Sequence, residues 1–128
     1  MTIDELRQAV ASGEIDTVLL ALTDMQGRLQ GKRFAAQHFL NTVLDHGSEA
    51  CNYLLAVDVE MNTVEGYSIA SWDKGYGDFV LQPDHSTLRR APWLPGTAMM
   101  LADLAWLDGT PVGPSPRQVL RRQLDRLA

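Results

Sequence analysis

The sequence has little that would suit a membrane protein or a disulfide-stapled extracellular fold. Its 128 residues include one cysteine, Cys51, so no internal disulfide can form. No run approaches the roughly 20 apolar residues of a membrane-spanning helix. The first residues, from Thr2 to Glu5, also lack the basic and then apolar pattern of a signal sequence. We therefore predict a cytoplasmic protein without a membrane partner, in which Cys51 is a buried free thiol.

Positive charge is also scarce. Lysine and arginine number 11 against 16 acidic residues, which gives a formal net charge of -5. Phosphate backbones attract clusters of basic side chains, whereas this chain has only short pairs such as Lys32-Arg33 and Arg89-Arg90. Neither GxxxxGK[ST] nor GxGxxG occurs, so the sequence lacks the common phosphate-binding loops. These absences argue against a nucleic-acid partner.

The first half of the chain predicts a helix, a hairpin and a second helix. Thr2-Ile3-Asp4-Glu5 is a capping box that starts a helix, and Gly13 can end it. The apolar run 17–23 and the segment 28–34 flank Asp24-Met25-Gln26-Gly27, which is typical of a tight turn. Apolar residues at helical spacing in 35–44 predict a helix that stops at Gly47.

The second half predicts further strands around one long loop. Residues 51–59 are expected to form a buried strand, and 78–81, 88–91 and 97–104 three more, with a turn at Asp108-Gly109. Residues 60–77 have no regular period, and loops of such length are usually functional or disordered. The aromatic residues of this loop argue against disorder. A hairpin, a helix and then more strands predict an α+β fold.

The last residues predict the start of another helix. Ser115 is placed to cap it and Pro116 takes the first helical position. The helix is amphipathic and no stop signal follows its apolar side chains, Leu120, Leu124 and Leu127. We therefore expect further protein to follow and to cover this apolar face.

Several short patterns resemble one enzyme family. Val64-Glu65-Gly66-Tyr67-Ser68-Ile69-Ala70-Ser71-Trp72 resembles the Phe-Asp-Gly-Ser-Ser-Ile-Gly-Gly-Trp loop of bacterial glutamine synthetases. Further matches follow in the same order: Asp24 with Gly27, Gly31-Lys32-Arg33, Gly77-Asp78, Pro83-Asp84 with Thr87, Pro92-Trp93, Asp103, Asp108-Gly109 with Pro111, and Pro116-Arg117. The set resembles the type I glutamine synthetase family, and residues 63–93 are most similar to its γ-glutamylpolyamine synthetases.

The resemblance implies a β-grasp N-terminal domain over residues 1–113, a mixed sheet with a packed helix. Residues 114–128 would begin a truncated catalytic domain. In the family, that catalytic domain holds ATP, Mg or Mn, and glutamate, and the N-terminal domain of a neighbouring subunit closes the pocket in a dodecamer. The resemblance therefore implies ATP and metal in the full-length ligase, none bound by this fragment alone, and no activity of the fragment alone.

The same resemblance assigns candidate site residues. Glu65 stands where the family has a catalytic aspartate that attracts and deprotonates the amine, and Ser68 matches a family serine that hydrogen-bonds across the subunit boundary. Trp72 would pack against the neighbour. Tyr67 replaces a small serine. The changes at positions 65 and 67 favour an acceptor larger than ammonia, a polyamine above all, or a diverged paralogue with weakened activity.

Other interpretations of these residues remain open. Glu65 alone would more often be a solvated carboxylate, and Tyr67 and Trp72 could simply hold the loop to the core. Asp58 and Glu60, two positions apart on an expected strand, share a face and with Glu65 could form a magnesium site. A small magnesium hydrolase that uses Asp58 and Glu60 is a third interpretation. A stand-alone β-grasp module that binds a protein partner without catalysis is the main alternative to a ligase.

Overall fold

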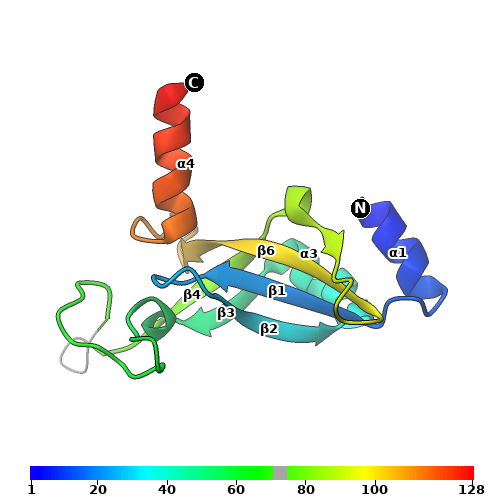
Figure 1. Ribbon diagram of the computed structural model, residues 1–128, viewed down its shortest axis with the longest axis horizontal. Helices are drawn as coiled ribbons and strands as arrows, with labels where there is room; N and C mark the ends of the chain where they lie inside the picture. Colours follow the sequence, from blue (N-terminus) through cyan, green and yellow to red (C-terminus); the bar gives the residue numbers. More distant parts are fainter. Residues whose placement is uncertain (71–74) are drawn as a thin grey trace.

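A mixed, curled sheet forms the body of the protein (Figure 1). The computed structural model describes residues 1–70 and 75–128. Along the sheet the strands run in the order β2 (Leu29–Ala35), β1 (Thr17–Thr23), β6 (Thr97–Trp106), β4 (Asp78–Pro83) and β3 (Ser48–Cys51), and β5 (Arg89–Arg90) also pairs with β6. The central pair β1 and β6 is parallel, and the other pairs are antiparallel. The predicted α+β class is confirmed.

The predicted hairpin is confirmed with almost the expected limits. β1 pairs with β2 from Thr17 opposite Ala35 to Thr23 opposite Leu29. The turn between the strands has Gly27 at φ +79°, a conformation that glycine adopts without steric cost. The amide of Gly27 donates to the carbonyl of Asp24 at 3.1 Å. Local turn chemistry thus decides where this chain reverses.

Two helical segments pack against the main core. α1 (Ile3–Ala11) starts at the predicted capping box, because Thr2 Oγ1 accepts from the amide of Glu5 and Glu5 accepts from the amide of Thr2. The second segment is continuous but irregular, made of α2 (Ala36–His38), a π-helical turn η1 (Phe39–Val43) and α3 (Leu44–His46). It ends at Gly47, as the sequence predicts. Leu6, Phe39 and Val43 bury their side chains in the main core.

The two edge strands of the sheet, β2 and β3, approach each other. Lys32 Nζ on β2 donates to Ser48 Oγ on β3 at 3.3 Å and also to the carbonyl of Glu49. These strands stand at opposite ends of the strand order, so the bonds require a strongly curled sheet. The curl agrees with the predicted β-grasp-like mixed sheet.

The segment 51–59 departs from its prediction as a buried strand. β3 ends at Cys51, and Asn52–Leu55 forms a short 3-10 helix, η2. Leu55, Ala56 and Val57 are buried, so the apolar run packs as a turn rather than as a paired strand. The prediction failed because burial alone does not distinguish a strand from a compact turn. Cys51 itself is half-exposed, so the predicted buried thiol was also wrong.

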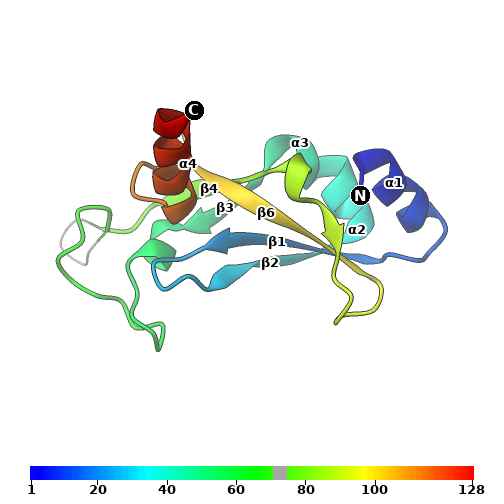
Figure 2. The same cartoon turned by 45° about the horizontal axis from the view of Figure 1, so that its top comes forward.

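Other boundaries and one predicted cap also differ from expectation. The strand expected at 88–91 is reduced to β5, preceded by a 3-10 turn, η3 (His85–Thr87), and β6 extends to Trp106. α4 (Pro116–Leu127) begins after Ser115 as predicted, but the Ser115 side chain makes no capping bond. In both views α4 stands off the end of β6, toward the same end of the sheet as the long loop, whereas α1 lies at the other end (Figures 1 and 2). None of the helices in the described ranges is long and apolar enough to cross a bilayer.

Candidate functional site

The loop that resembles the glutamine synthetase motif leaves the sheet between η2 and β4. We call residues 64–72 the Glu65 loop, and the structure describes residues 64–70 of it. Glu65 and Ser68 are exposed, Tyr67 is half-buried and Ala70 is buried. Gly66, next to Glu65, has φ +98° and so permits a sharp reversal. Trp72, the fourth predicted site residue, lies outside the described residues.

The first end of the Glu65 loop is fixed by a small hairpin. Val57 and Thr63 form an antiparallel bridge, and the amide of Val64 donates to the carbonyl of Ala56 at 2.9 Å. Met61 within the hairpin has φ +68°, which is uncommon for a residue with a side chain. The chain therefore enters the Glu65 loop from a defined position.

Asp58 organises the turn of this hairpin. Its Oδ1 accepts from the amides of Glu60 and Asn62, both at 2.9 Å, and Oδ2 accepts from Asn62 Nδ2 at 3.2 Å. The bonds from Asn62 are the main cause that lowers the pKa of Asp58. Asp58 and Glu60 thus lie in a turn, and the predicted strand face that would join them is absent. Residues 1–70 and 75–128 contain no group of three or more acidic, histidine or cysteine side chains placed to hold a metal.

The β1–β2 turn holds the same hairpin from the other side. Arg28 Nη1 donates to the carbonyl of Val59 at 2.6 Å and Nη2 to that of Asp58 at 3.0 Å. Gln26 Nε2 donates to the carbonyl of Val57 at 2.8 Å. Three successive carbonyls are therefore bound by side chains from residues about 30 positions away. Sequence reasoning gave no role to Arg28 or Gln26, although both lie within or beside the turn motif.

Asp24 holds the side chain of Arg28 in place. Its carboxylate is buried and accepts from the amides of Gln26 and Arg28, from Arg28 Nε at 2.8 Å and from Gln30 Nε2 at 2.5 Å. Burial alone would raise the pKa of Asp24, but the bonds from Gln30, Arg28 and Gln26 outweigh it and hold the pKa below its usual value. The ionised Asp24 therefore positions Arg28, which binds the hairpin before the Glu65 loop.

Asn52 fixes the other end of the Glu65 loop. Its side chain is buried, and Nδ2 donates to the carbonyl of Ile69 at 3.3 Å. The amide of Gly77 donates to Asn52 Oδ1, and the amide of Asn52 donates to the carbonyl of Gly77 at 2.8 Å. One side chain therefore ties together both limbs of the long loop. Nothing in the sequence pattern distinguishes Asn52, because its role depends on long-range contacts in the folded chain.

A small pocket opens beside the hairpin that precedes the Glu65 loop. It has a volume of about 270 Å³ and is lined by Cys51, Tyr53, Thr63 and Tyr76. The rings of Tyr53 and Tyr76 meet edge to face, with centroids 6.4 Å apart. The surface of the pocket is apolar. It is suited to a short apolar group rather than to a charged one.

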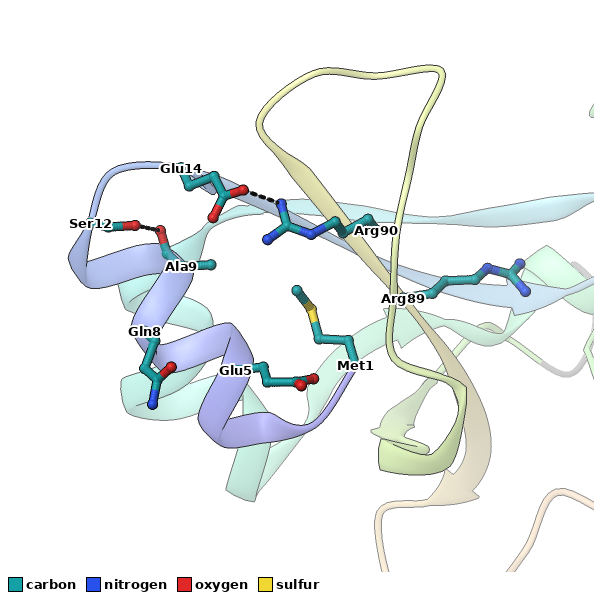
Figure 3. Close-up of a pocket in the computed structure, with 8 residues that line it drawn as sticks. All are labelled: Met1, Glu5, Gln8, Ala9, Ser12, Glu14, Arg89 and Arg90. Atoms are coloured by element: carbon teal, nitrogen blue, oxygen red, sulfur yellow. Dashed lines mark hydrogen bonds and ion pairs between the residues drawn. The ribbon is translucent and has the colours of Figure 1, made fainter.

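A larger pocket lies at the other end of the molecule, between α1 and β5 (Figure 3). Arg90 turns toward Glu14 and pairs with it at 3.0 Å, whereas Arg89 points away from the pocket. The side chain of Met1 extends between α1 and β5. Both partners of the ion pair are about half exposed, where such pairs contribute little stability. This pocket is separate from the Glu65 loop.

A second cluster joins α4 to the sheet. Arg117 Nε donates to Asp103 Oδ1 at 2.9 Å, and Nη2 donates to Asp84 Oδ2 at 2.6 Å. Burial would lower the pKa of Arg117, but the two carboxylates outweigh it and raise the pKa. Thr87 completes the cluster, because its Oγ1 accepts from the amide of Leu101 and donates to the carbonyl of Asp84. All four side chains belong to the motif positions that carried the family resemblance.

Comparisons with known proteins agree with this fold and with these motifs. No family model matches the chain. The chain superposes on the crystal structure of a novel glutamine synthase homolog with a TM-score of 0.73 and 24% identity, over 88% of this chain and 26% of that one. The architecture is therefore that of the corresponding region of glutamine synthetase homologues.

Two sequence relatives define the group more closely. Over 98% of its length the chain is 67% identical to gamma-glutamylethanolamide synthetase GlnA4 of Streptomyces coelicolor, and over 95% it is 37% identical to glutamate–isopropylamine ligase of a Pseudomonas species. It spans 27% of the length of each relative. The chain is therefore homologous to the glutamine synthetase-like ligases, and the family resemblance is confirmed.

Proposed function

We propose that this chain is the N-terminal domain of an ATP-dependent ligase that joins the γ-carboxyl group of glutamate to a primary amine. The observation that supports it most directly is that Glu65 and Ser68 are exposed on a loop that is held at both ends, by the Ala56–Val64 bond and by Asn52. Its homology to ligases favours this function over a binding module without catalysis. The proposed domain limits are 1–113, with 114–128 beginning the catalytic domain.

In the proposed reaction Glu65 acts on the amine. An amine in water is an ammonium ion, and it must lose a proton before it can attack an activated carboxyl group. A carboxylate at the pocket mouth attracts the cation and, where water is excluded, pairs with it strongly and accepts the proton. Ser68 would donate to the neighbouring subunit, and Tyr67 and Trp72 would line or close the contact.

ATP and a divalent metal belong to the rest of the proposed enzyme. The described residues contain no group of three or more acidic, histidine or cysteine side chains placed to hold a metal, and neither glycine-rich phosphate motif occurs in the sequence. Phosphorylation of glutamate by ATP would supply the activated carboxyl group, whereas this chain would supply the wall that receives the amine. We also propose that this domain contacts the active site of a neighbouring subunit, and that the full-length protein forms a ring-shaped dodecamer. The proposed enzyme is cytoplasmic.

The acceptor in this proposal is an amine larger than ammonia. The names of the two relatives contain an ethanolamide and isopropylamine, and the corresponding amines, ethanolamine and isopropylamine, have two and three carbons. The similarity of residues 63–93 to polyamine-glutamylating enzymes adds putrescine and spermidine as candidates. The longer side chain at position 65 moves the carboxylate by about 1 Å relative to aspartate, enough to change the position of the amine.

An acceptor assay on the full-length ligase tests this proposal. Amine-dependent phosphate release and the γ-glutamyl product would be measured with ammonia, ethanolamine, isopropylamine, putrescine and spermidine. We expect Glu65→Gln to lower kcat/KM for the amine about 100-fold while leaving ATP binding unchanged, because only the proton acceptor is lost. The matched control is Glu60→Gln, an exposed glutamate of the same loop region. If no amine stimulates phosphate release, or if Glu60→Gln is equally damaging, the proposal fails.

A further inference from the structure

We infer that the pocket formed by Cys51, Tyr53, Thr63 and Tyr76 binds the alkyl chain of the amine acceptor. This inference rests on the proposed function and adds the part of the substrate that the pocket would select. The occupant is a short aliphatic chain, such as that of ethylamine, propylamine or ethanolamine, with its nitrogen directed toward Glu65.

The position of the pocket supports this assignment. Thr63 lines it and is two residues from Glu65, so the Cα atoms of these residues lie within about 7 Å of each other. Thr63 is also fixed by the bridge to Val57, which Gln26 holds through a hydrogen bond. The wall of the pocket and the start of the Glu65 loop are therefore parts of one braced hairpin.

The shape and chemistry of the pocket define the class of ligand. Tyr53 and Tyr76 provide aromatic walls, Cys51 a thiol and Thr63 a small side chain. Its volume of about 270 Å³ lies below the roughly 300–1,000 Å³ typical of pockets for drug-sized ligands. An apolar pocket of this size can enclose a few methylene groups, whereas a longer polyamine would project from it.

Among the residues that the structure describes, none that lines the pocket has a carboxylate, ammonium or guanidinium group. The four described lining residues have thiol, phenol and hydroxyl groups as their only polar side-chain groups. A second ammonium group would therefore lose hydration on entering without gaining an anionic partner. Methylene groups would instead gain from leaving water. The pocket is thus suited to a monoamine with an apolar or hydroxyl-bearing tail.

The test uses the full-length ligase and a series of linear amines from ammonia to butylamine. In the wild-type enzyme kcat/KM should rise with each added carbon until the pocket is full, by about tenfold for each well-packed methylene. Thr63→Met should fill the pocket and abolish this rise, lowering kcat/KM for propylamine at least tenfold. Unchanged circular dichroism and unchanged ATP binding would show that the variant folds.

Matched variants separate the pocket from general damage. Thr42→Met makes the same substitution at an exposed helical position and should keep the wild-type profile. Cys51→Met narrows the pocket from a second wall and should act like Thr63→Met. If the wild-type enzyme glutamylates amines, and Thr63→Met and Cys51→Met both keep its dependence of kcat/KM on chain length, this inference alone is overturned. An enzyme with no amine activity would overturn the proposed function instead.

Discussion

Arg117, in the first turn of α4, donates to Asp84 at 2.6 Å across 33 positions of sequence. The same guanidinium donates to Asp103 on β6, so one side chain joins α4, the β4–η3 connection and the central strand. All three side chains are partly buried. These ion pairs therefore connect α4 to the sheet.

Removal of Arg117 should release α4 and destabilise the fold. We expect Arg117→Ala to lower the free energy of unfolding by about 1–3 kcal/mol, because two partly buried carboxylates lose a charged donor. Urea unfolding followed by circular dichroism measures the change. Arg121→Ala removes an exposed arginine of the same helix and should change stability by less than about 0.5 kcal/mol. Equal effects of the two changes would show that the ion pairs do not hold α4.

The contribution of Asp24 should depend on pH in a defined direction. Its folded pKa is lowered below 3.8, so it stabilises the fold fully above that pH and loses this contribution as pH falls further. We expect the difference in unfolding free energy between the wild type and Asp24→Asn to be constant between about pH 5 and 7 and to shrink below about pH 4.

Urea unfolding at several pH values measures this difference. Asp45→Asn, at an exposed position on α3, serves as the control for a change in net charge. A difference for Asp24→Asn that grows on acidification would contradict the assigned bonds.

Arg28 should control the order of the hairpin before the Glu65 loop. Arg28→Ala removes the donors to the carbonyls of Asp58 and Val59, so this hairpin should open more often than the sheet does. We expect amide hydrogen exchange at Asn62 and Val64 to accelerate more than tenfold, beyond any change at β6 amides. Arg33→Ala, at an exposed position of β2, is the control and should leave these amides protected. Uniform acceleration across the whole chain would indicate global destabilisation and contradict a local role.

Gly47 should not tolerate a side chain. It has φ +73° and ψ -167°, and a Cβ atom there would lie 2.6 Å from the carbonyl oxygen of Leu81 and 2.7 Å from Val80 Cγ1. We expect Gly47→Ala to destabilise the protein by about 2–4 kcal/mol, since backbone strain and a clash with β4 add.

Gly27 provides the matched comparison. It has a similar φ of +79°, but no atom lies within 4 Å of the position that an added Cβ would occupy, so Gly27→Ala should cost only about 1 kcal/mol from backbone strain. Thermal and urea unfolding of both variants measure the contrast. Similar losses would mean that the close approach between Gly47 and β4 is less important than backbone conformation.

The sequence was sufficient for elements with local signals. The capping box at Thr2, the Asp24–Gly27 turn and the stop at Gly47 act over a few residues, and the structure has each of them. The segment 51–59 was wrongly predicted to be a strand, because its backbone conformation depends on contacts with residues distant in sequence. Asn52 bonds to Ile69 and Gly77, and these contacts turn the chain just where a strand was expected.

The candidate site shows the same division. Motif order indicated Glu65, Tyr67 and Ser68 and the family to which they are similar, but their catalytic and interface roles remain predictions. The supports beneath the loop were invisible in the sequence, because Arg28 and Gln26 act on carbonyls some 30 residues away. Backbone carbonyls have no residue-specific signature, so no sequence pattern could have paired them with these donors.

By itself the sequence determined the α+β class, the order of most strands and helices, and the family likeness, since each depends on short-range periodicity or on motif order. Tertiary structure alone decided the curl that joins Lys32 to β3, the meeting of Arg117 with Asp84 and Asp103, and the pocket beside Thr63. The physical reason is that these features are long-range contacts, whose geometry is fixed only when the whole core packs.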